Sequence, residues 1–121
     1  MALDYLDFDF SGDADGGGSF EAMASVPATH WPALQAQVVQ VLDWAVRAFG
    51  APAAVDEGGE WDYALHGVRE SSTPLVVVYA PGARELQLRA GADDPARMTL
   101  TLTLSGTEAF CASFRQAFAL P

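Results

Sequence analysis

The segment Met98–Leu104 reads MTLTLTL, and it carries the clearest structural signal in the chain. Its apolar side chains alternate with threonines, which is the period of a β-strand that has one apolar and one polar face. Threonine suits such a strand because its branched Cβ fits a pleated surface. This segment therefore predicts a sheet with one covered face and one face in water.

Three further strands are predicted on the N-terminal side of this segment. Leu75–Tyr79 reads LVVVY and is apolar on both faces, Pro81 and Gly82 predict a turn, and Glu85–Ala90 alternates apolar and polar residues. We expect a tight hairpin with a well-buried first strand. The segment 61–66 alternates in the same way and predicts another strand, whereas 91–97 is predicted to be a loop.

Two helices are predicted from apolar residues that recur at steps of three and four. The first covers Thr29–Phe49, with Thr29 as a possible cap and Gly50 as the residue that ends it. The second follows Ser105, which stands three residues before Glu108 in the spacing of a capping box. Its apolar stripe consists of Phe110, Phe114 and Phe118.

The N-terminal region predicts a hairpin, because residues 6–10 and 20–26 both alternate apolar and polar side chains. The glycine-rich segment SGDADGGGS at 11–19 is predicted to be its long, mobile tip. The complete order is β-β-α-β-β-β-β-α. We therefore predict one α+β domain over residues 1–121, with a mostly antiparallel sheet of about six strands and two helices packed on one face.

The charge is distributed unevenly along the chain. Residues 1–62 hold eleven acidic residues and one arginine, whereas residues 63–121 hold five of each, so the net charge of −10 arises in the first half. Nucleic acids and anionic membranes are bound through clustered positive charge, and we therefore expect neither as a partner. A protein with a basic surface fits this charge distribution.

Cysteine content and hydropathy bear on the cellular compartment. The single cysteine, Cys111, cannot form an internal disulfide, and the N-terminus is acidic where a signal peptide is basic and apolar. The longest apolar run, at 75–80, is too short for the roughly 20 residues that span a bilayer. We expect a cytoplasmic protein, and the use of arginine without lysine favours a bacterium with a GC-rich genome.

The region Asp7–Asp15 has some features of an EF-hand calcium loop. In a frame that starts at Asp7, the twelfth position, which requires glutamate, is Gly18, and in a frame that starts at Ser11 it is Ala22. Because the bidentate ligand is missing in both frames, we expect Ca²⁺ to bind weakly or not at all. With two histidines and one cysteine in the chain, a zinc site is not expected, and no cofactor is predicted.

Catalytic motifs are scarce. The chain has no serine elbow, phosphate loop or dinucleotide-binding glycine motif, and it has no lysine for Schiff-base chemistry. Asp62 and His66 share a strand face but lie about 13 Å apart along a strand, beyond hydrogen-bond reach. Cys111 lies in the apolar stripe of the second helix and is interpreted as a small core residue. The protein is therefore not expected to be an enzyme, although this question stays open.

The remaining candidate residues are polar groups on the uncovered sheet face and in the adjacent loops. They are Asp7, Asp9, Asp13, Asp15, Glu60, Asp62 and His66. We expect a non-catalytic protein-binding module, such as an adaptor, a chaperone-like protein or a neutralising partner. The alternative is a small hydrolase, metal-dependent or not, that uses carboxylates from 56–62 or 7–15 and requires a pocket that gathers them. No oligomeric state is predicted from the sequence.

Overall fold

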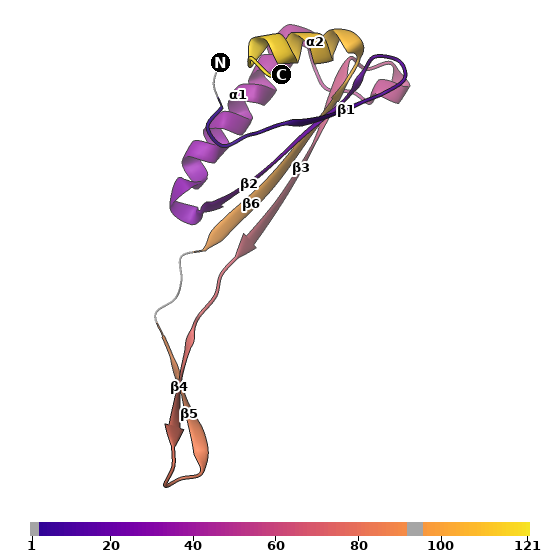
Figure 1. The fold of residues 1–121 in the computed structure, drawn as a ribbon. Helices are drawn as coiled ribbons and strands as arrows, with labels where there is room; N and C mark the ends of the chain where they lie inside the picture. Colours follow the sequence, from indigo (N-terminus) through magenta and orange to yellow (C-terminus); the bar gives the residue numbers. More distant parts are fainter. Residues whose placement is uncertain (1–2, 92–95) are drawn as a thin grey trace.

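The computed structural model describes residues 3–91 and 96–121 and has the predicted α+β architecture (Figure 1). The predicted order β-β-α-β-β-β-β-α is confirmed, and short 3₁₀ turns lie at Ala28–His30 and Val55–Glu57. The main elements are β1 (Asp9–Gly12), β2 (Gly18–Pro27), α1 (Trp31–Phe49), β3 (Trp61–Glu70), β4 (Leu75–Ala80), β5 (Glu85–Ala90), β6 (Arg97–Gly106) and α2 (Glu108–Ala117).

The MTLTLTL segment lies inside a four-stranded antiparallel sheet with the order β1-β2-β6-β3. Strand β6 pairs with β2 on one side and with β3 on the other over its full length, so that Leu102 lies opposite both Ala22 and Leu65. Its leucines face the helices and are buried, whereas its threonines lie on the opposite face, which we call the outer face. We call residues 3–70 and 96–121 the body.

The other two strands form a separate hairpin that projects from the body, and we call residues 75–90 the arm (Figure 1). The β3–β6 ladder ends at Glu70 and Arg97, and the β4–β5 ladder begins at Leu75 and Ala90. The six predicted strands are therefore divided between two sheets. The prediction of a well-buried LVVVY strand is wrong, because the arm extends beyond the sheet that the helices cover.

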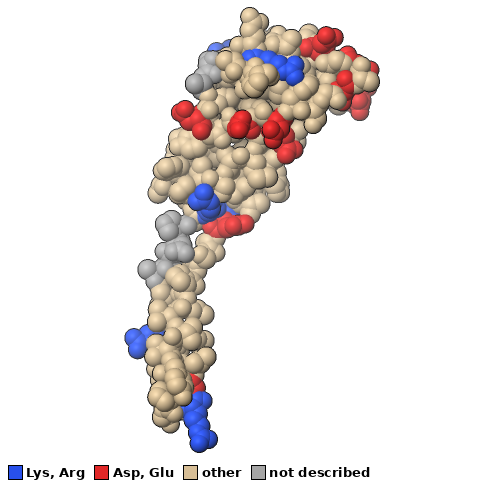
Figure 2. Space-filling model, in the orientation of Figure 1, with Lys and Arg blue, Asp and Glu red and all other residues tan. Residues whose placement is uncertain are grey.

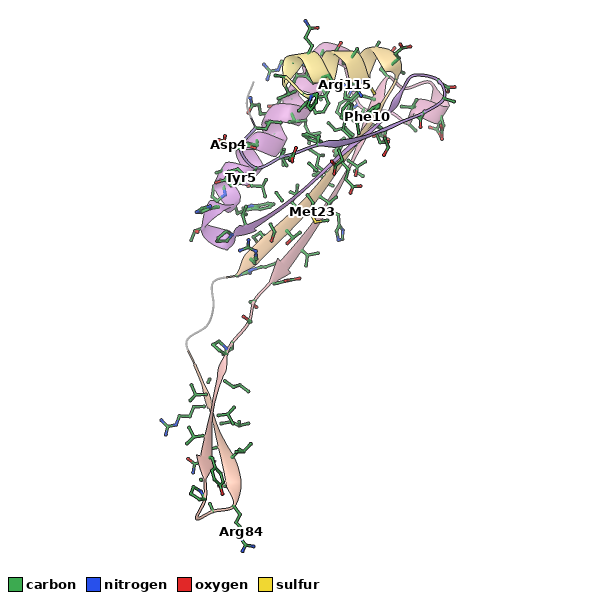
Figure 3. The ribbon with its side chains drawn as sticks, in the orientation of Figure 1. Asp4, Tyr5, Phe10, Met23, Arg84 and Arg115 are labelled. Carbon is green, nitrogen blue, oxygen red and sulfur yellow. The ribbon has the colours of Figure 1, made fainter. Side chains whose placement is uncertain are left out.

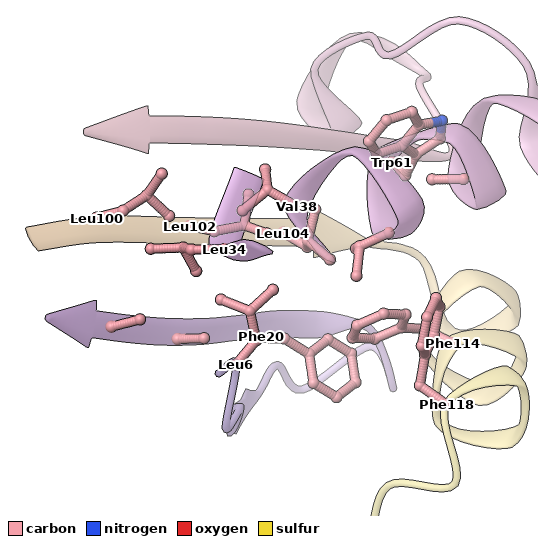
Figure 4. Close-up of a cluster of buried hydrophobic side chains, with 14 of the residues drawn as sticks. Leu6, Phe20, Leu34, Val38, Trp61, Leu100, Leu102, Leu104, Phe114 and Phe118 are labelled. Carbon is pink, nitrogen blue, oxygen red and sulfur yellow. The ribbon is translucent and has the colours of Figure 1, made fainter. Parts of the chain in front are cut away.

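The core lies between the helices and the inner face of the four-stranded sheet (Figure 4). Helix α1 contributes Leu34 and Val41, and α2 contributes Phe110 and Phe114, all four fully buried. Trp61 stacks on Phe110 at a centroid distance of 5.8 Å, and its indole N–H donates to the Gly50 carbonyl at 2.9 Å. Among the described residues, no helical segment combines the length and the hydropathy of a membrane span.

Several predicted boundaries require correction. Helix α1 begins at Trp31, after a 3₁₀ turn that includes Thr29. The N-cap of α2 is Thr107, whose hydroxyl accepts from the Phe110 N–H at 3.4 Å, because Ser105 still belongs to β6. In the predicted loop at 91–97, Arg97 already belongs to β6, and residues 92–95 lie outside the described residues.

Candidate functional site

The outer face of the sheet carries or adjoins Asp7, Asp9 and His66, and the end of this face carries Asp62, opposite Ser105 in β6. Asp9 in β1 is opposite Glu21 in β2, and His66 in β3 is opposite Thr101 in β6. Asp7 is exposed but precedes β1, because the first strand begins at Asp9 and not at Leu6. These residues are spread over the sheet and its edge and do not form one compact site.

Asp62 and three further predicted residues come together at the end of the body away from the arm, where Figure 2 shows acidic side chains gathered. Two adjoining hollows of about 290 and 500 Å³ lie there. Asp13 lines both of them, Asp62 lines the smaller one, and Asp15 and Glu60 line the larger one. We call this region the acidic end. Two further carboxylates, Asp56 and Glu108, also line the hollows.

Backbone packing explains why these distant segments meet. The β1–β2 turn is closed by hydrogen bonds from Asp13 N–H to the Gly17 carbonyl at 2.8 Å and from Gly16 N–H to the Asp13 carbonyl at 3.2 Å. Gly17 is buried beside Gly106, where a Cβ would lie 2.6 Å from the Gly106 carbonyl oxygen. The turn therefore packs directly on the junction between β6 and α2.

Thr107 attaches the segment before β3 to the same junction. Its hydroxyl donates to Glu60 Oε2 at 2.7 Å, and its N–H donates to the Glu60 carbonyl at 3.0 Å. The Asp62 carboxylate accepts from the Tyr63 N–H at 2.8 Å. Two of the clustered carboxylates thus accept hydrogen bonds that stabilise the local backbone.

The region considered as a calcium loop is a β-hairpin in the structure. Pairing continues through Ser11 with Ser19 and Gly12 with Gly18, so the irregular tip is shorter than the sequence predicts. The mobility predicted for this segment stays a prediction. Within residues 3–91 and 96–121, no three His, Cys, Asp or Glu side chains lie close enough together to hold a metal ion.

Cys111 is a core residue, as its position in the apolar stripe predicts, and it is 1% exposed. Burial raises the pKa of its thiol, although the positive charge of Arg115 and a hydrogen bond with the Gly18 backbone act in the opposite direction. The thiol therefore stays protonated at neutral pH, where the thiolate needed for nucleophilic attack is scarce.

The arm is the feature that sequence reasoning missed. On one of its faces the cross-strand register groups apolar side chains only, and its five large side chains are each more than half exposed. The residues of this face are Leu75, Val77, Tyr79, Leu86, Leu88 and Ala90. The other face mixes Val76 and Val78 of β4 with polar residues of β5. The sequence predicts the alternation within β5. It does not predict that no other element covers the apolar face of this strand.

A second apolar surface lies where α1 fails to cover β3. A groove of about 330 Å³ runs between them and includes Leu65, which is 45% exposed although it lies on the inner face of the sheet. Val39 of α1, on the opposite wall, is 46% exposed. Among the described strands, β3 pairs only with β6. The edge of β3 that faces away from β6 therefore has no strand paired to it beside this groove.

Comparison of the chain with protein-family models, with curated proteins and with solved structures finds no match in any of the three. The function of the chain is therefore inferred from the geometry of the arm, the groove and the acidic end.

Proposed function

We propose that this chain is a non-catalytic protein-binding module whose main contact element is the arm. The observation that carries this proposal is the exposed apolar face of β4 and β5. A two-stranded hairpin has no core of its own and is marginally stable in water, so an apolar face of this kind requires a cover. Large exposed apolar patches on soluble proteins are characteristic of interaction surfaces.

The acidic end supplies a second element, which supports a partner with a basic surface. Asp13, Asp15 and Glu60 are exposed and come from segments far apart in the chain, and the hollows they line are large enough to receive long basic side chains. Exposed charges of this kind mainly accelerate encounter and select among partners. Their effect decreases with salt, because charges are screened beyond about 8 Å at physiological ionic strength.

Affinity purification of the tagged protein from its native cells tests this proposal. A variant with Leu86→Ser and Leu88→Ser removes apolar area from the arm, and Gln87→Ser on the opposite face of the same strand is the matched control. We expect the first variant to lose the bound protein and the control to retain it. Equal recovery by both variants would contradict a role for the arm.

The charge component has a separate test. Replacement of Asp13, Asp15 and Glu60 by their amides should slow association with the isolated partner at low salt and leave the dissociation rate almost unchanged. Asp7→Asn with Asp9→Asn is the control, because these residues lie away from the hollows. An association rate that is independent of both salt and the acidic end would restrict the function to the arm.

A second candidate is a small hydrolase that uses carboxylates of the acidic end. The observation that favours it is the pair of hollows, since they gather carboxylates from both regions that this hypothesis named. Hydrolysis of generic ester, peptide or phosphoester substrates, abolished by Asp13→Asn with Glu60→Gln, would support it. Turnover that survives this double variant would exclude these carboxylates as its source.

A further inference from the structure

We propose that the protein covering the arm is a second copy of this chain, and that two copies exchange arms reciprocally. In this arrangement the arm of each copy lies along the open edge of β3 of the other copy, over the groove between β3 and α1. The inference rests on the proposed function, because it names the partner of the same apolar face. Three observations carry it: the chain geometry, the groove and the charge.

The chain geometry allows a closed two-fold arrangement. Strands β3 and β4 follow one another in the chain with only residues 71–74 between them, and the arm continues the β3–β6 ribbon away from the body (Figure 1). A two-fold axis near 71–74 would place β4 of each copy antiparallel to β3 of the other. Each arm would then extend the partner's sheet through β4, a known mode of recognition in which backbone hydrogen bonds supply affinity. The contact is self-complementary and closes after two copies.

The groove matches the arm in chemistry. It is lined mainly by apolar side chains, and Leu65 and Val39 on its two walls are each almost half exposed. A strand placed beside β3 directs alternate side chains toward this groove, and the arm has apolar residues at alternate positions. Tyr79, which is 69% exposed, is well suited as an anchor because tyrosine is enriched among residues that dominate binding energy. One contact would therefore cover both exposed apolar surfaces.

The charges of the arm and the body are complementary. The arm contains two arginines, Arg84 and Arg89, and one glutamate, Glu85, whereas the rest of the chain contains fifteen acidic residues and four arginines. Figure 3 shows Arg84 at the tip of the arm. Two bodies repel each other, so a contact that places the positive arm of one copy on the acidic body of the other is favoured over contact between bodies. Arms packed only on one another would bring like charges together.

Analytical ultracentrifugation of the full chain over a wide concentration range is the first test. We expect a reversible monomer–dimer equilibrium for the unmodified chain. Leu88→Glu in the arm and Leu65→Glu in the groove should each weaken the dimer by about tenfold or more, because both place a charge in an apolar contact. Gln87→Glu adds the same charge on the polar face of the arm. It should weaken the dimer by less than Leu88→Glu or Leu65→Glu does. Circular dichroism verifies that each variant is folded.

Cross-linking then distinguishes arm–body contact from arm–arm contact. In chains with Cys111→Ala, Tyr79→Cys is introduced in one chain and Leu65→Cys in another. We expect intermolecular disulfides mainly in the mixture of the two chains. Cross-linking of the Tyr79→Cys chain with itself, equal to or greater than that of the mixture, would show that the arms pack on each other and would overturn the proposed exchange.

The outcomes separate this inference from the proposed function. A chain that stays monomeric at every concentration overturns the exchange. If the arm variant nevertheless loses an unlike protein in the purification experiment, the protein-binding function stands with a different partner. If the arm variant changes neither self-association nor protein recovery, both proposals fail.

Discussion

The body and the arm are built from the same kind of sequence, yet only one of them is covered. Strand β6 in the body buries Leu100, Leu102 and Leu104 to 7% exposure or less, whereas Leu86 and Leu88 in the arm are each 62% exposed. Strands β6 and β5 both alternate apolar with polar residues, and each pairs antiparallel with its neighbours. The difference arises because α1 and α2 pack on the body and no described element packs on the arm. Local alternation thus specifies a strand with an apolar face, but tertiary structure decides what covers that face.

The strongest test of this contrast compares a leucine in each region. Leu102→Ala in β6 should lower the free energy of unfolding by about 2 to 5 kcal/mol, because it removes fully buried atoms and leaves a cavity. Leu88→Ala in β5 should change it by no more than about 0.5 kcal/mol in dilute solution. Urea titration followed by circular dichroism measures both values. A large loss for Leu88→Ala at high dilution would mean that the arm packs on its own body.

The destabilisation caused by Leu88→Ala and by Leu102→Ala should depend differently on protein concentration. If arms are exchanged, Leu88→Ala should become more destabilising relative to the unmodified chain, because association stabilises the folded state by mass action. The cost of the Leu102→Ala cavity itself should depend little on concentration. Repeating the urea titrations over a range of concentrations tests this, and a constant difference for Leu88→Ala would count against the exchange.

Two glycines provide a comparison with a smaller effect. A Cβ at Gly106 would lie 2.6 Å from Phe110 Cγ and 2.8 Å from Phe110 Cβ, so Gly106→Ala should cost about 1 to 3 kcal/mol through overpacking. A Cβ at Gly82 in the turn of the arm would meet nothing within 4 Å, and Gly82→Ala should stay within about 1 kcal/mol, toward stabilisation. Thermal unfolding at low concentration measures the pair. Equal costs would contradict the packing described at the start of α2.

The smallest expected effect concerns the buried thiol. Burial raises the pKa of Cys111 in the folded state, so above the ordinary value of 9.0 the unfolded chain loses its proton first. Stability should therefore fall with rising pH by at most about 1.4 kcal/mol per pH unit, until the pH passes the folded pKa. The difference in unfolding free energy between the unmodified chain and Cys111→Ala, followed from about pH 8 to 10, reports this contribution.

An exposed thiol in the arm serves as the control. Tyr79→Cys in the Cys111→Ala background should show no comparable slope in dilute solution, because the group is accessible in both the folded and the unfolded state. It should also react with a thiol reagent much faster than Cys111 does in the unmodified chain. Similar reaction rates for the two thiols would show that the body opens far more readily than its packing indicates.

The candidate site was only partly predictable from the sequence. The sequence predicts that four acidic residues are exposed, namely Asp13, Asp15, Glu60 and Asp62. Their convergence on two hollows depends on the packing of the β1–β2 turn against Gly106. The sequence gives no reason to separate these four from Asp7, Asp9 and His66, which alternation also places at polar strand positions. The structure spreads these three over the outer face and its edge. Alternation assigns a residue to a face and gives no position across the strands.

The sequence by itself determined the order of elements and the apolar face of each strand. Periods of two and of 3.6 residues are local properties that the backbone geometry of strands and helices imposes. Only the tertiary structure decided that β6 pairs with β2 and β3, and that β4 and β5 form an arm beyond the helices. Strand pairing and helix cover join residues far apart in the chain. For this reason the same apolar alternation became core in Met98–Leu104 and exposed surface in Glu85–Ala90.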